Sequence, residues 1–166
     1  YRQVYGLDVK IARVFNTYGP RMKLRDGLLI PDFILNAIED KDLVIYGDAD
    51  MEFSFCYISD MIDGLLKLMQ TGPEMSLVNL GSDQVYKISE VADMLIKMTN
   101  SSSKIVYEAP LSIFMHKGKP NLQRAKEMLG WIPLVRLSDG LRNTIDYTIA
   151  NKGMVEMNGD HPRLYR

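Results

Sequence analysis

The sequence predicts an α/β fold, and three observations point to it. Segments typical of strands alternate with segments typical of helices along the 166 residues. The composition, 46% hydrophobic and 25% charged, is that of a globular protein large enough to bury a core. No internal repeat and no low-complexity linker interrupts the alternation. The early strand-helix units would finish a larger doubly wound sheet, and the later ones would form a smaller lobe.

The strand predictions rest on apolar runs that end in turn residues. The first run, residues 7–15, is almost continuously apolar, which is typical of a strand buried on both faces in a parallel sheet. The turn at 16–20 ends it. Four shorter strands are predicted at residues 43–46, 53–58, 77–80 and 104–107.

The helix predictions rest on caps and breakers. Pro31 suits the first turn of a helix that runs to about Ile38. Other helices are expected to begin at polar cap residues, and Gly130 is expected to end one of them. These caps are Ser59 with Asp60, Ser89, Asn121 and Ser138. In the last helix, Leu141, Ile145 and Ile149 recur at four-residue spacing, and the stretch at 153–166 reads as a polar tail.

Composition excludes several classes of protein. A net charge of −1 gives no basic surface for nucleic acid, and no run approaches the roughly 20 apolar residues of a membrane span. The single Cys56 excludes an intrachain disulfide or a multi-cysteine zinc site, and two histidines are too few for a His-rich metal site. No signal peptide opens the sequence. We therefore expect a soluble, cytoplasmic protein without a metal site.

The first residues suggest a piece of a longer protein. The sequence opens at Tyr1 without an initiator Met, and Gly6 is typical of the residue that ends a helix. We therefore expect that the chain starts near the end of a helix and continues something upstream.

Polar residues gather after the first predicted strand, in residues 16–23. Ligands bind open parallel sheets beyond the carboxyl ends of their strands, where Asn16 and Thr17 offer an amide and a hydroxyl. Three cations follow within five residues: Arg21, Lys23 and Arg25. Such donors suit a diphosphate, which Arg grips with two hydrogen bonds. The alternative is a solvated turn with scattered charges.

The run ARVFNTYGPRM at residues 12–22 resembles the extended short-chain dehydrogenase/reductase family of nucleotide-sugar enzymes, the NAD-dependent epimerases and dehydratases. Further similar segments follow in the family's order: IPDFILNAIEDKDLVIYGD, SFCYISDMIDGLLKLM, VNLGS and GKPNLQRAKEMLGWIP. The resemblance covers about residues 1–150 and corresponds to the C-terminal part of such an enzyme, with the PRM ending most similar to UDP-glucuronate decarboxylases. It implies the C-terminal portion of a Rossmann-like sheet plus a small α/β substrate-binding lobe, over residues 1–152.

The resemblance also shows which catalytic parts the sequence lacks. The family holds NAD with a Gly-rich loop, and none of the 12 glycines forms G-x-x-G-x-x-G or G-x-G-x-x-G. Its catalytic pair is a Tyr followed four residues later by Lys, and none of the nine tyrosines has that Lys. The resemblance therefore implies no catalytic residue in this chain, which alone should be inactive.

The family's chemistry assigns this portion to the substrate. Bound NAD+ oxidises the sugar at C4, the 4-keto group activates decarboxylation, elimination or epimerisation, and NADH returns the hydride. By position, Tyr1 and Asn16 match substrate-contacting residues, Asn16 at the diphosphate. Thr17 matches a cofactor-side threonine and Arg21 the family's loop arginine. Four residues fall where the base is sandwiched, with plain core packing as the alternative: Leu29, Phe33, Leu43 and Tyr46.

Two positions depart from the family pattern. Many relatives carry a diphosphate-binding Arg where this sequence has Phe53. A second Arg, in an Arg-Lys-Pro-Asp run, is replaced by Gly118 in the run 118–121, and Lys117 or Lys119 would have to substitute. The choice of nucleotide and sugar stays open for this reason.

Other chemically suggestive residues have ordinary explanations. Cys56 is expected to be an inert buried thiol and His116 an exposed loop residue. Asp60 and Asp63 are expected to cap a helix and offset its dipole. Trp131 should anchor the end of a helix, and the 11 methionines should fill the core.

The resemblance therefore implies part of a nucleotide-sugar enzyme, most similar to the UDP-glucuronate decarboxylases, that uses NAD, binds a UDP-sugar and forms a homodimer when intact. A dTDP-glucose 4,6-dehydratase and a 4-epimerase are the alternatives within the class. A nucleotide-sugar-binding or interaction module without catalysis is the alternative from another class.

Overall fold

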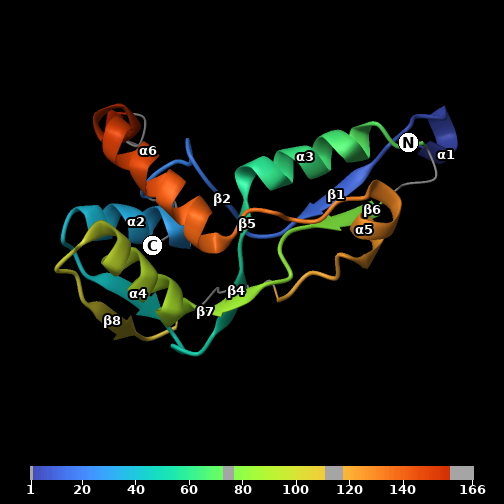
Figure 1. The fold of residues 1–166 in the computed structure, drawn as a ribbon. Coiled ribbons are helices and arrows are strands. Elements are labelled where there is room, and N and C mark those ends of the chain that lie inside the picture. Colours follow the sequence, from blue (N-terminus) through green and yellow to red (C-terminus); the bar gives the residue numbers. More distant parts are fainter. Residues whose placement is uncertain (1, 73–76, 111–117, 158–166) are drawn as a thin grey trace. The chain divides into compact units, whose positions relative to one another are not determined.

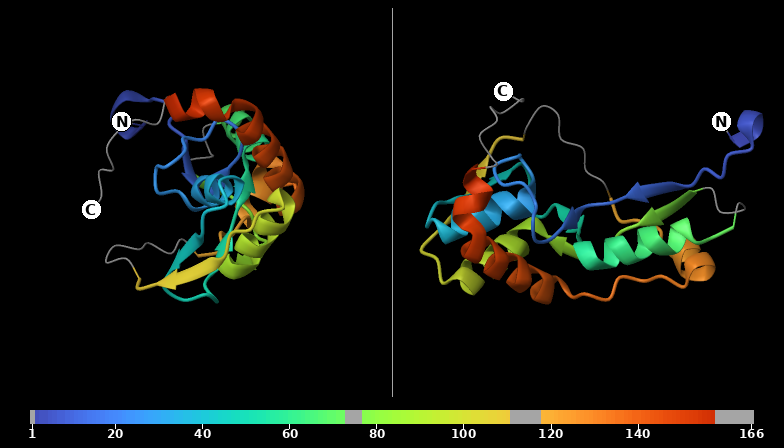
Figure 2. Two further views of the ribbon diagram at one scale, coloured as in Figure 1. Left: turned by 90° about the vertical axis from the view of Figure 1, so that its left-hand side faces the viewer. Right: turned by 90° about the horizontal axis from the view of Figure 1, so that it is seen from above.

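The computed structural model describes residues 2–72, 77–110 and 118–157, which divide into two compact units (Figures 1 and 2). Unit 1 combines Tyr1–Thr17, Phe53–Val85 and Lys117–Val135, and unit 2 combines Tyr18–Glu52, Tyr86–His116 and Arg136–Arg166. The expected division into early and later segments is therefore wrong, because each unit draws on three separated segments. Parallel strand pairs cause this, since their partners need a long crossover connection.

Unit 1 is built on the parallel pair β1 and β6, in the register Ile11↔Leu77 to Val14↔Leu80. Helix α3 contacts both strands, and α5 contacts α3 and β6. The elements are α1 (Arg2–Tyr5), β1 (Ile11–Val14), α3 (Ile58–Met69), β6 (Leu77–Leu80) and α5 (Gln123–Leu129). Gly6 follows α1 with φ of 64°, and Gly130 follows α5 with φ of 57°, so both glycines end their helices as predicted.

The first strand exists but is not buried on both faces, as the sequence predicted. Strand β1 is shorter than expected, and its Ile11 and Val14 are 55% and 42% exposed. A strand of a parallel sheet is enclosed only when strands flank both edges and helices cover both faces. Among the described strands, β1 pairs with β6 alone.

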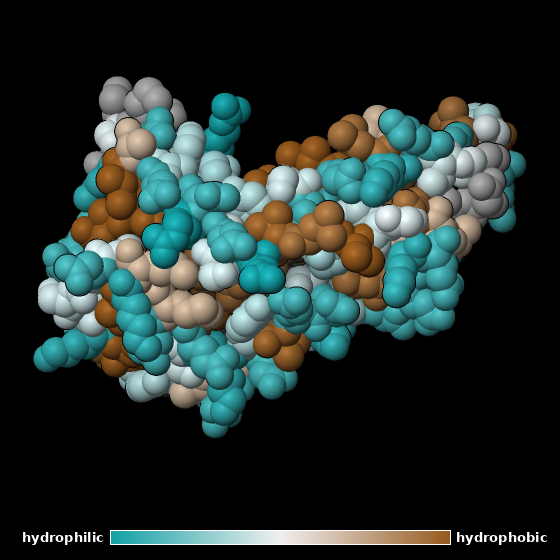
Figure 3. Space-filling model, viewed as in Figure 1, coloured by the Kyte–Doolittle hydropathy of each residue, from teal (hydrophilic) through white to brown (hydrophobic). Residues whose placement is uncertain are grey.

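Helix α3 is apolar on two sides. Its inner face packs on β1 and β6, whereas Ile62, Leu66 and Met69 are 49%, 52% and 73% exposed. These three residues recur four and three positions apart, so they share one face of the helix. Apolar surface over this part of unit 1 is visible in Figure 3.

Trp131 is the centre of the core of unit 1, and its predicted anchoring role is confirmed. The side chain is 1% exposed, and its indole Nε1 donates a hydrogen bond of 2.9 Å to the backbone oxygen of Asp60. The ring lies against α3 at Gly64, where a Cβ would sit 3.0 Å from both Trp131 and Leu80. Gly64 therefore permits the close packing of α3 on β6 and Trp131.

Asp60 does not cap α3, contrary to the sequence prediction. The cap residue is Tyr57, and Asp60 is the third residue of the helix. Its carboxylate Oδ2 instead accepts hydrogen bonds from the backbone N–H groups of Leu134, at 3.0 Å, and Val135, at 2.9 Å. Asp60 is 8% exposed, so this carboxylate fastens the segment after α5 to the start of α3. Asp63 forms an ion pair with Lys67 at 3.0 Å.

Unit 2 has the parallel pair β3 and β8, in the register Leu43↔Ile105 to Tyr46↔Glu108. Helices α2 and α4 contact β3 and one another, and α6 packs on both helices. The elements are α2 (Leu29–Ile38), β3 (Leu43–Tyr46), α4 (Ile88–Thr99), β8 (Ile105–Glu108) and α6 (Leu137–Met157). The bounds predicted for β3 and for the end of α2 are confirmed.

Two further predicted caps are wrong, because buried residues begin these helices one position earlier. Ile88 and Leu137 are each 3% exposed and are the first residues of α4 and α6, so Ser89 and Ser138 lie inside the helices. Ser89 Oγ donates to the backbone oxygen of Ala49 at 3.2 Å. Asn121 is not the cap residue of α5 either, because Leu122 holds that position. Its Oδ1 accepts a hydrogen bond of 2.9 Å from the N–H of Gln123, the first residue of the helix.

Helix α6 also differs from its predicted pattern. It continues to Met157, past the start of the predicted tail at residue 153. Leu141 and Ile145 are buried as expected, whereas Ile149 is 57% exposed.

The remaining strands are short and lie, in the sequence, at or near the residues where the chain passes from one unit to the other. They are β2 (Thr17–Tyr18), β4 (Glu52–Ser54), β5 (Cys56–Tyr57) and β7 (Val85–Lys87). The strand predicted at 53–58 is thus divided in two, with Phe55 between β4 and β5, and its last residue, Ile58, begins α3.

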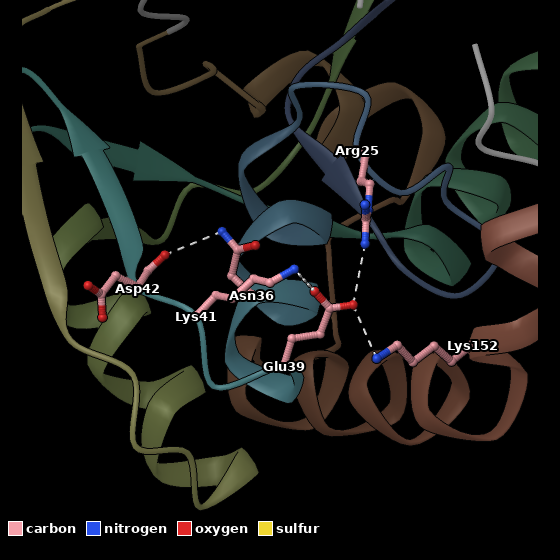
Figure 4. A network of polar contacts seen from close by, with 6 residues as sticks. All are labelled: Arg25, Asn36, Glu39, Lys41, Asp42 and Lys152. Atoms are coloured by element: carbon pink, nitrogen blue, oxygen red, sulfur yellow. Dashed lines mark hydrogen bonds and ion pairs between the residues drawn. The ribbon is translucent and has the colours of Figure 1, made fainter. Parts of the chain in front are cut away.

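Glu39 is the centre of a charge network at the end of α2 (Figure 4). Its Oε2 lies 2.6 Å from Lys41 Nζ, and its Oε1 lies 3.1 Å from Lys152 Nζ and 3.4 Å from Arg25. The carboxylate therefore connects three parts of unit 2. The pKa of Glu39 is lowered, chiefly by the hydrogen bond from Lys41. Burial opposes this shift, and the hydrogen bond from Lys152 and the charges of both lysines add to it.

Replacement of Gly64 by Ala should destabilise unit 1. The added methyl group meets Leu80 and Trp131 at 3.0 Å, and overpacking of about 1–3 kcal/mol exceeds a helix-propensity gain of about 1 kcal/mol. Urea unfolding followed by far-ultraviolet circular dichroism, which reports the helices of both units, measures the loss. Gly153→Ala is the control, because nothing lies within 4 Å of a Cβ at that helical position, and it should not destabilise. A Gly64→Ala protein as stable as the parent would contradict this packing.

Replacement of Glu39 by Gln should lower stability by about 1 kcal/mol near pH 7, because exposed ion pairs contribute at most about 1 kcal/mol each. The lowered pKa of Glu39 means that its contribution is fully present above its ordinary value of 4.5. The contribution is lost as pH falls through the lower folded-state pKa. The gap between the two proteins should therefore close as urea unfolding is repeated toward pH 3. A difference in stability between the two proteins that stays constant with pH would show that the ionised carboxylate of Glu39 is not its cause.

Candidate functional site

Asn16 lies just beyond the carboxyl end of β1, where the sequence predicted a binding residue. Phe15 N–H donates to the backbone oxygen of Leu80 at 2.9 Å, which ties this loop to the end of β6. Asn16 Nδ2 donates to the backbone oxygen of Ser54 at 3.3 Å, and the Asn16 backbone oxygen accepts from Cys56 N–H at 2.8 Å. Asn16 is therefore held in place by both its side chain and its backbone.

The two strand ends meet a third segment at Gly81. A Cβ on Gly81 would lie 2.8 Å from the Phe15 side chain and 3.0 Å from Pro120. The loop after β1, the residue after β6 and the segment before α5 are therefore in close contact. Lys119, one of the two lysines proposed to replace a missing arginine, is next to Pro120 and is exposed.

Thr17 forms a local turn. Its Oγ1 donates to the backbone oxygen of Phe15 at 2.9 Å, which leaves the hydroxyl able to accept one further hydrogen bond. Its cofactor-side role stays a prediction.

Arg21 belongs to unit 2 and is exposed. Its backbone is left-handed, with φ of 67°, and it borders a hollow of about 10 Å³, room for about one water molecule. The other walls include Pro31 of α2 and Thr144, Tyr147 and Thr148 of α6. The guanidinium is accessible to an anion, although this hollow is too small for a nucleotide.

The four residues expected at the base differ in exposure. Phe33 and Leu43 are 4% and 0% exposed, in the core of unit 2, which fits the alternative of plain core packing. Leu29 is half-buried, and Tyr46 is 37% exposed. The base-binding role of the four stays a prediction, with Leu29 and Tyr46 the accessible members.

Phe53 provides no positive charge in place of the diphosphate-binding arginine that the family pattern has at this position. The side chain is 8% exposed, and its ring stacks on Phe55 with centroids 6.0 Å apart. Residues Tyr1, His116 and Lys117 lie outside the described residues, so their predicted roles have no structural counterpart here.

Cys56 is buried, as expected of an inert thiol. It is 1% exposed, and its Sγ lies 3.7 Å from the backbone oxygen of Tyr57. Burial, with a smaller contribution from the charge of Asp60, raises the pKa of the thiol to about 12. The thiolate, which is the reactive form, is therefore scarce near neutral pH.

Ser54 is the residue near this site that the sequence analysis missed. It is 2% exposed, and its hydroxyl has no hydrogen-bond partner among the described residues. A single serine in an apolar strand has no pattern that would mark it in advance.

Unit 1 also has an open concavity of about 1040 Å³ beside α5. Two lysines, Lys119 and Lys126, lie on its wall together with the acidic Asp83 and Glu127. The charges balance, so this surface gives no preference for an anion.

In the part of the chain that the structure describes, no helix is both long and apolar enough to cross a membrane. Nor do three metal-ligating side chains gather anywhere in those residues.

Comparison with known proteins supports the assignment of this fold. The sequence model of the NAD dependent epimerase/dehydratase family matches residues 1–81. UDP-glucuronic acid decarboxylase 1 of Xenopus tropicalis is 37% identical over 147 residues, which are 89% of this chain and 35% of the relative. UDP-glucuronic acid decarboxylase 5 of Arabidopsis thaliana is 37% identical over 141 residues, 85% of this chain and 41% of the relative.

Solved structures agree with the sequence matches. UDP-glucose 4-epimerase from Thermotoga maritima, solved with UDP-glucose, superposes with a TM-score of 0.85 at 26% identity, covering 91% of this chain and 49% of that chain. UDP-glucuronic acid 4-epimerase from Bacillus cereus, in complex with UDP-glucuronic acid and NAD, has a TM-score of 0.78 at 28% identity, covering 90% and 48%.

Fold and site together define an α/β protein whose polar loop lies at the carboxyl ends of parallel strands. The chain belongs to the NAD-dependent epimerase/dehydratase family. It spans 35% to 41% of the length of these two decarboxylases and about half that of the solved epimerases. The α/β fold class predicted from the sequence is confirmed.

Cys56 should not react with iodoacetamide in the folded protein at pH 8. Its thiol is 1% exposed with a pKa raised to about 12, so both access and ionisation are unfavourable. Mass spectrometry should find no adduct under native conditions and one adduct in urea, where the pKa returns to about 9. Rapid labelling of the folded protein would contradict the burial of Cys56.

Proposed function

We propose that this chain is the nucleotide-sugar-binding part of a UDP-glucuronic acid decarboxylase. Relatives of that name are 37% identical to it over 85% to 89% of its length, and this observation carries the proposal. The geometry supports it, because Asn16 is fixed beyond the carboxyl end of β1, where ligands of open parallel sheets bind. Substrate contacts are proposed for Tyr1, Asn16, Arg21, Leu29, Phe33, Leu43 and Tyr46.

NAD is proposed as the cofactor of the intact enzyme. The family is NAD-dependent, and the Bacillus cereus epimerase was solved with NAD bound. Within this chain Thr17 is the one candidate toward the cofactor, and the sequence contains no Gly-rich loop for the pyrophosphate. The residues present do not by themselves form an NAD site.

The alternatives within the class differ in the fate of the sugar. The likeness to UDP-glucuronic acid 4-epimerase, at 28% identity, keeps 4-epimerisation as the second candidate. A dTDP-glucose 4,6-dehydratase is the third, and a binding module without catalysis is the alternative of another class. We propose a homodimer for the intact protein, as the resemblance implies, and a cytoplasmic location, as expected from the composition of the sequence.

The full protein encoded with any sequence upstream of Tyr1 tests the proposal. Incubated with NAD and UDP-glucuronic acid, it should release CO₂, measured as labelled carbon from the carboxyl group. Isolation of a C4 epimer without CO₂ would identify an epimerase instead. An initiator Met directly before Tyr1 in the gene would support the binding module.

Asn16→Ala and Arg21→Ala should each weaken binding of UDP-glucuronic acid about tenfold or more, the effect expected for one lost hydrogen bond to a charged group. Titration calorimetry measures the affinity. Asn143→Ala and Arg142→Ala are matched controls, because both residues are exposed on α6, and they should bind as the parent does. Equal affinity in all four variants would refute the assigned contacts.

A further inference from the structure

We propose that the hydroxyl of Ser54 donates a hydrogen bond to an oxygen of the bound nucleotide sugar. The proposal rests on the function proposed above and adds a substrate-contacting residue to it. Ser54 is the last residue of β4, and its side chain is 2% exposed.

The hydroxyl of Ser54 has no partner among the described residues, and its oxygen is closed to solvent. Leaving such a group unpaired is costly, so buried polar atoms are nearly always hydrogen-bonded to protein, water or ligand. An unpaired hydroxyl in a ligand-free protein is therefore the state expected of a group whose partner arrives with the ligand.

Other buried hydroxyl groups of this protein do have partners. Thr144 and Thr148 donate to backbone oxygens four residues earlier, at 2.7 and 2.8 Å. Ser103 Oγ lies 2.7 Å from Ser101 Oγ, and Ser82 Oγ accepts from Gln84 N–H at 3.2 Å. The lack of a hydrogen bond thus distinguishes the hydroxyl of Ser54 from those of these four residues.

The position of Ser54 connects it to the candidate site. Its backbone oxygen accepts the hydrogen bond from Asn16 Nδ2 at 3.3 Å, so the two residues are in direct contact at the end of β1. Phe53 and Phe55 stack on one another, and alternation along an extended strand directs Ser54 to the opposite side from these rings. The hydroxyl is therefore separated from the aromatic pair and adjacent to a proposed substrate contact.

The contact with Asn16 uses the backbone of Ser54, so Ser54→Ala removes the hydroxyl and leaves that contact intact. In the ligand-free full protein, the melting temperature of Ser54→Ala should equal or exceed that of the parent, since an unpaired polar group is lost. Its dissociation constant for UDP-glucuronic acid should rise about tenfold, and the ligand-induced increase in melting temperature should shrink accordingly.

Ser103→Ala is the matched control in unit 2, because it removes a buried hydroxyl that is paired. It should lower the melting temperature and leave the dissociation constant unchanged. If Ser54→Ala lowers the ligand-free melting temperature as this control does, or binds UDP-glucuronic acid as the parent does, the proposal is wrong. Failure of the parent itself to bind any of UDP-glucuronic acid, UDP-glucose and dTDP-glucose would overturn the proposed function as well, so the two failures are distinguishable.

Discussion

The packing of unit 1 depends on the hydrogen bonds that join Asp60 to Trp131 and to the segment after it. The backbone oxygen of Asp60 accepts the indole N–H, and its carboxylate accepts two backbone N–H groups of residues 134 and 135. A residue in the first turn of α3 thereby fixes a segment more than 70 positions later in the chain. Because that segment follows α5, the same contacts keep α5 and the indole on β6. The negative charge also contributes to the high pKa of the neighbouring Cys56.

Hydrogen bonds to backbone groups fix the conformation of the candidate site. Asn16 is held between a hydrogen bond to Ser54 and one from Cys56, and Phe15 is bonded to the end of β6. Gly81 lets Phe15 and Pro120 approach closer than any side chain would allow. A ligand at this loop would meet polar groups that are already positioned, so little conformational entropy would be lost there on binding.

The sequence predicted best those features that depend on neighbouring residues. Pro31 fixes its own φ at a value that suits a helix, and Gly130 readily adopts the left-handed φ that ends one, so α2 and the end of α5 lie where expected. The predictions for Asp60, Ser89 and Ser138 failed because distant residues decide whether a polar side chain caps a helix. The position of Asn16 at the end of a parallel strand was predictable from pattern and resemblance. The importance of Ser54 was not, since burial and a missing partner are properties of the folded chain.

Trp131 is the only tryptophan among the 166 residues, and it is buried in unit 1. The protein therefore contains an intrinsic fluorophore that is specific to one of its two units. Exposure of the indole to water would shift its emission to longer wavelength, so the emission spectrum reports the folding of unit 1, whereas far-ultraviolet circular dichroism sums the helices of both units. A helical signal lost before the emission shifts would belong to α2, α4 and α6, and the cooperativity between the units becomes a measurable quantity.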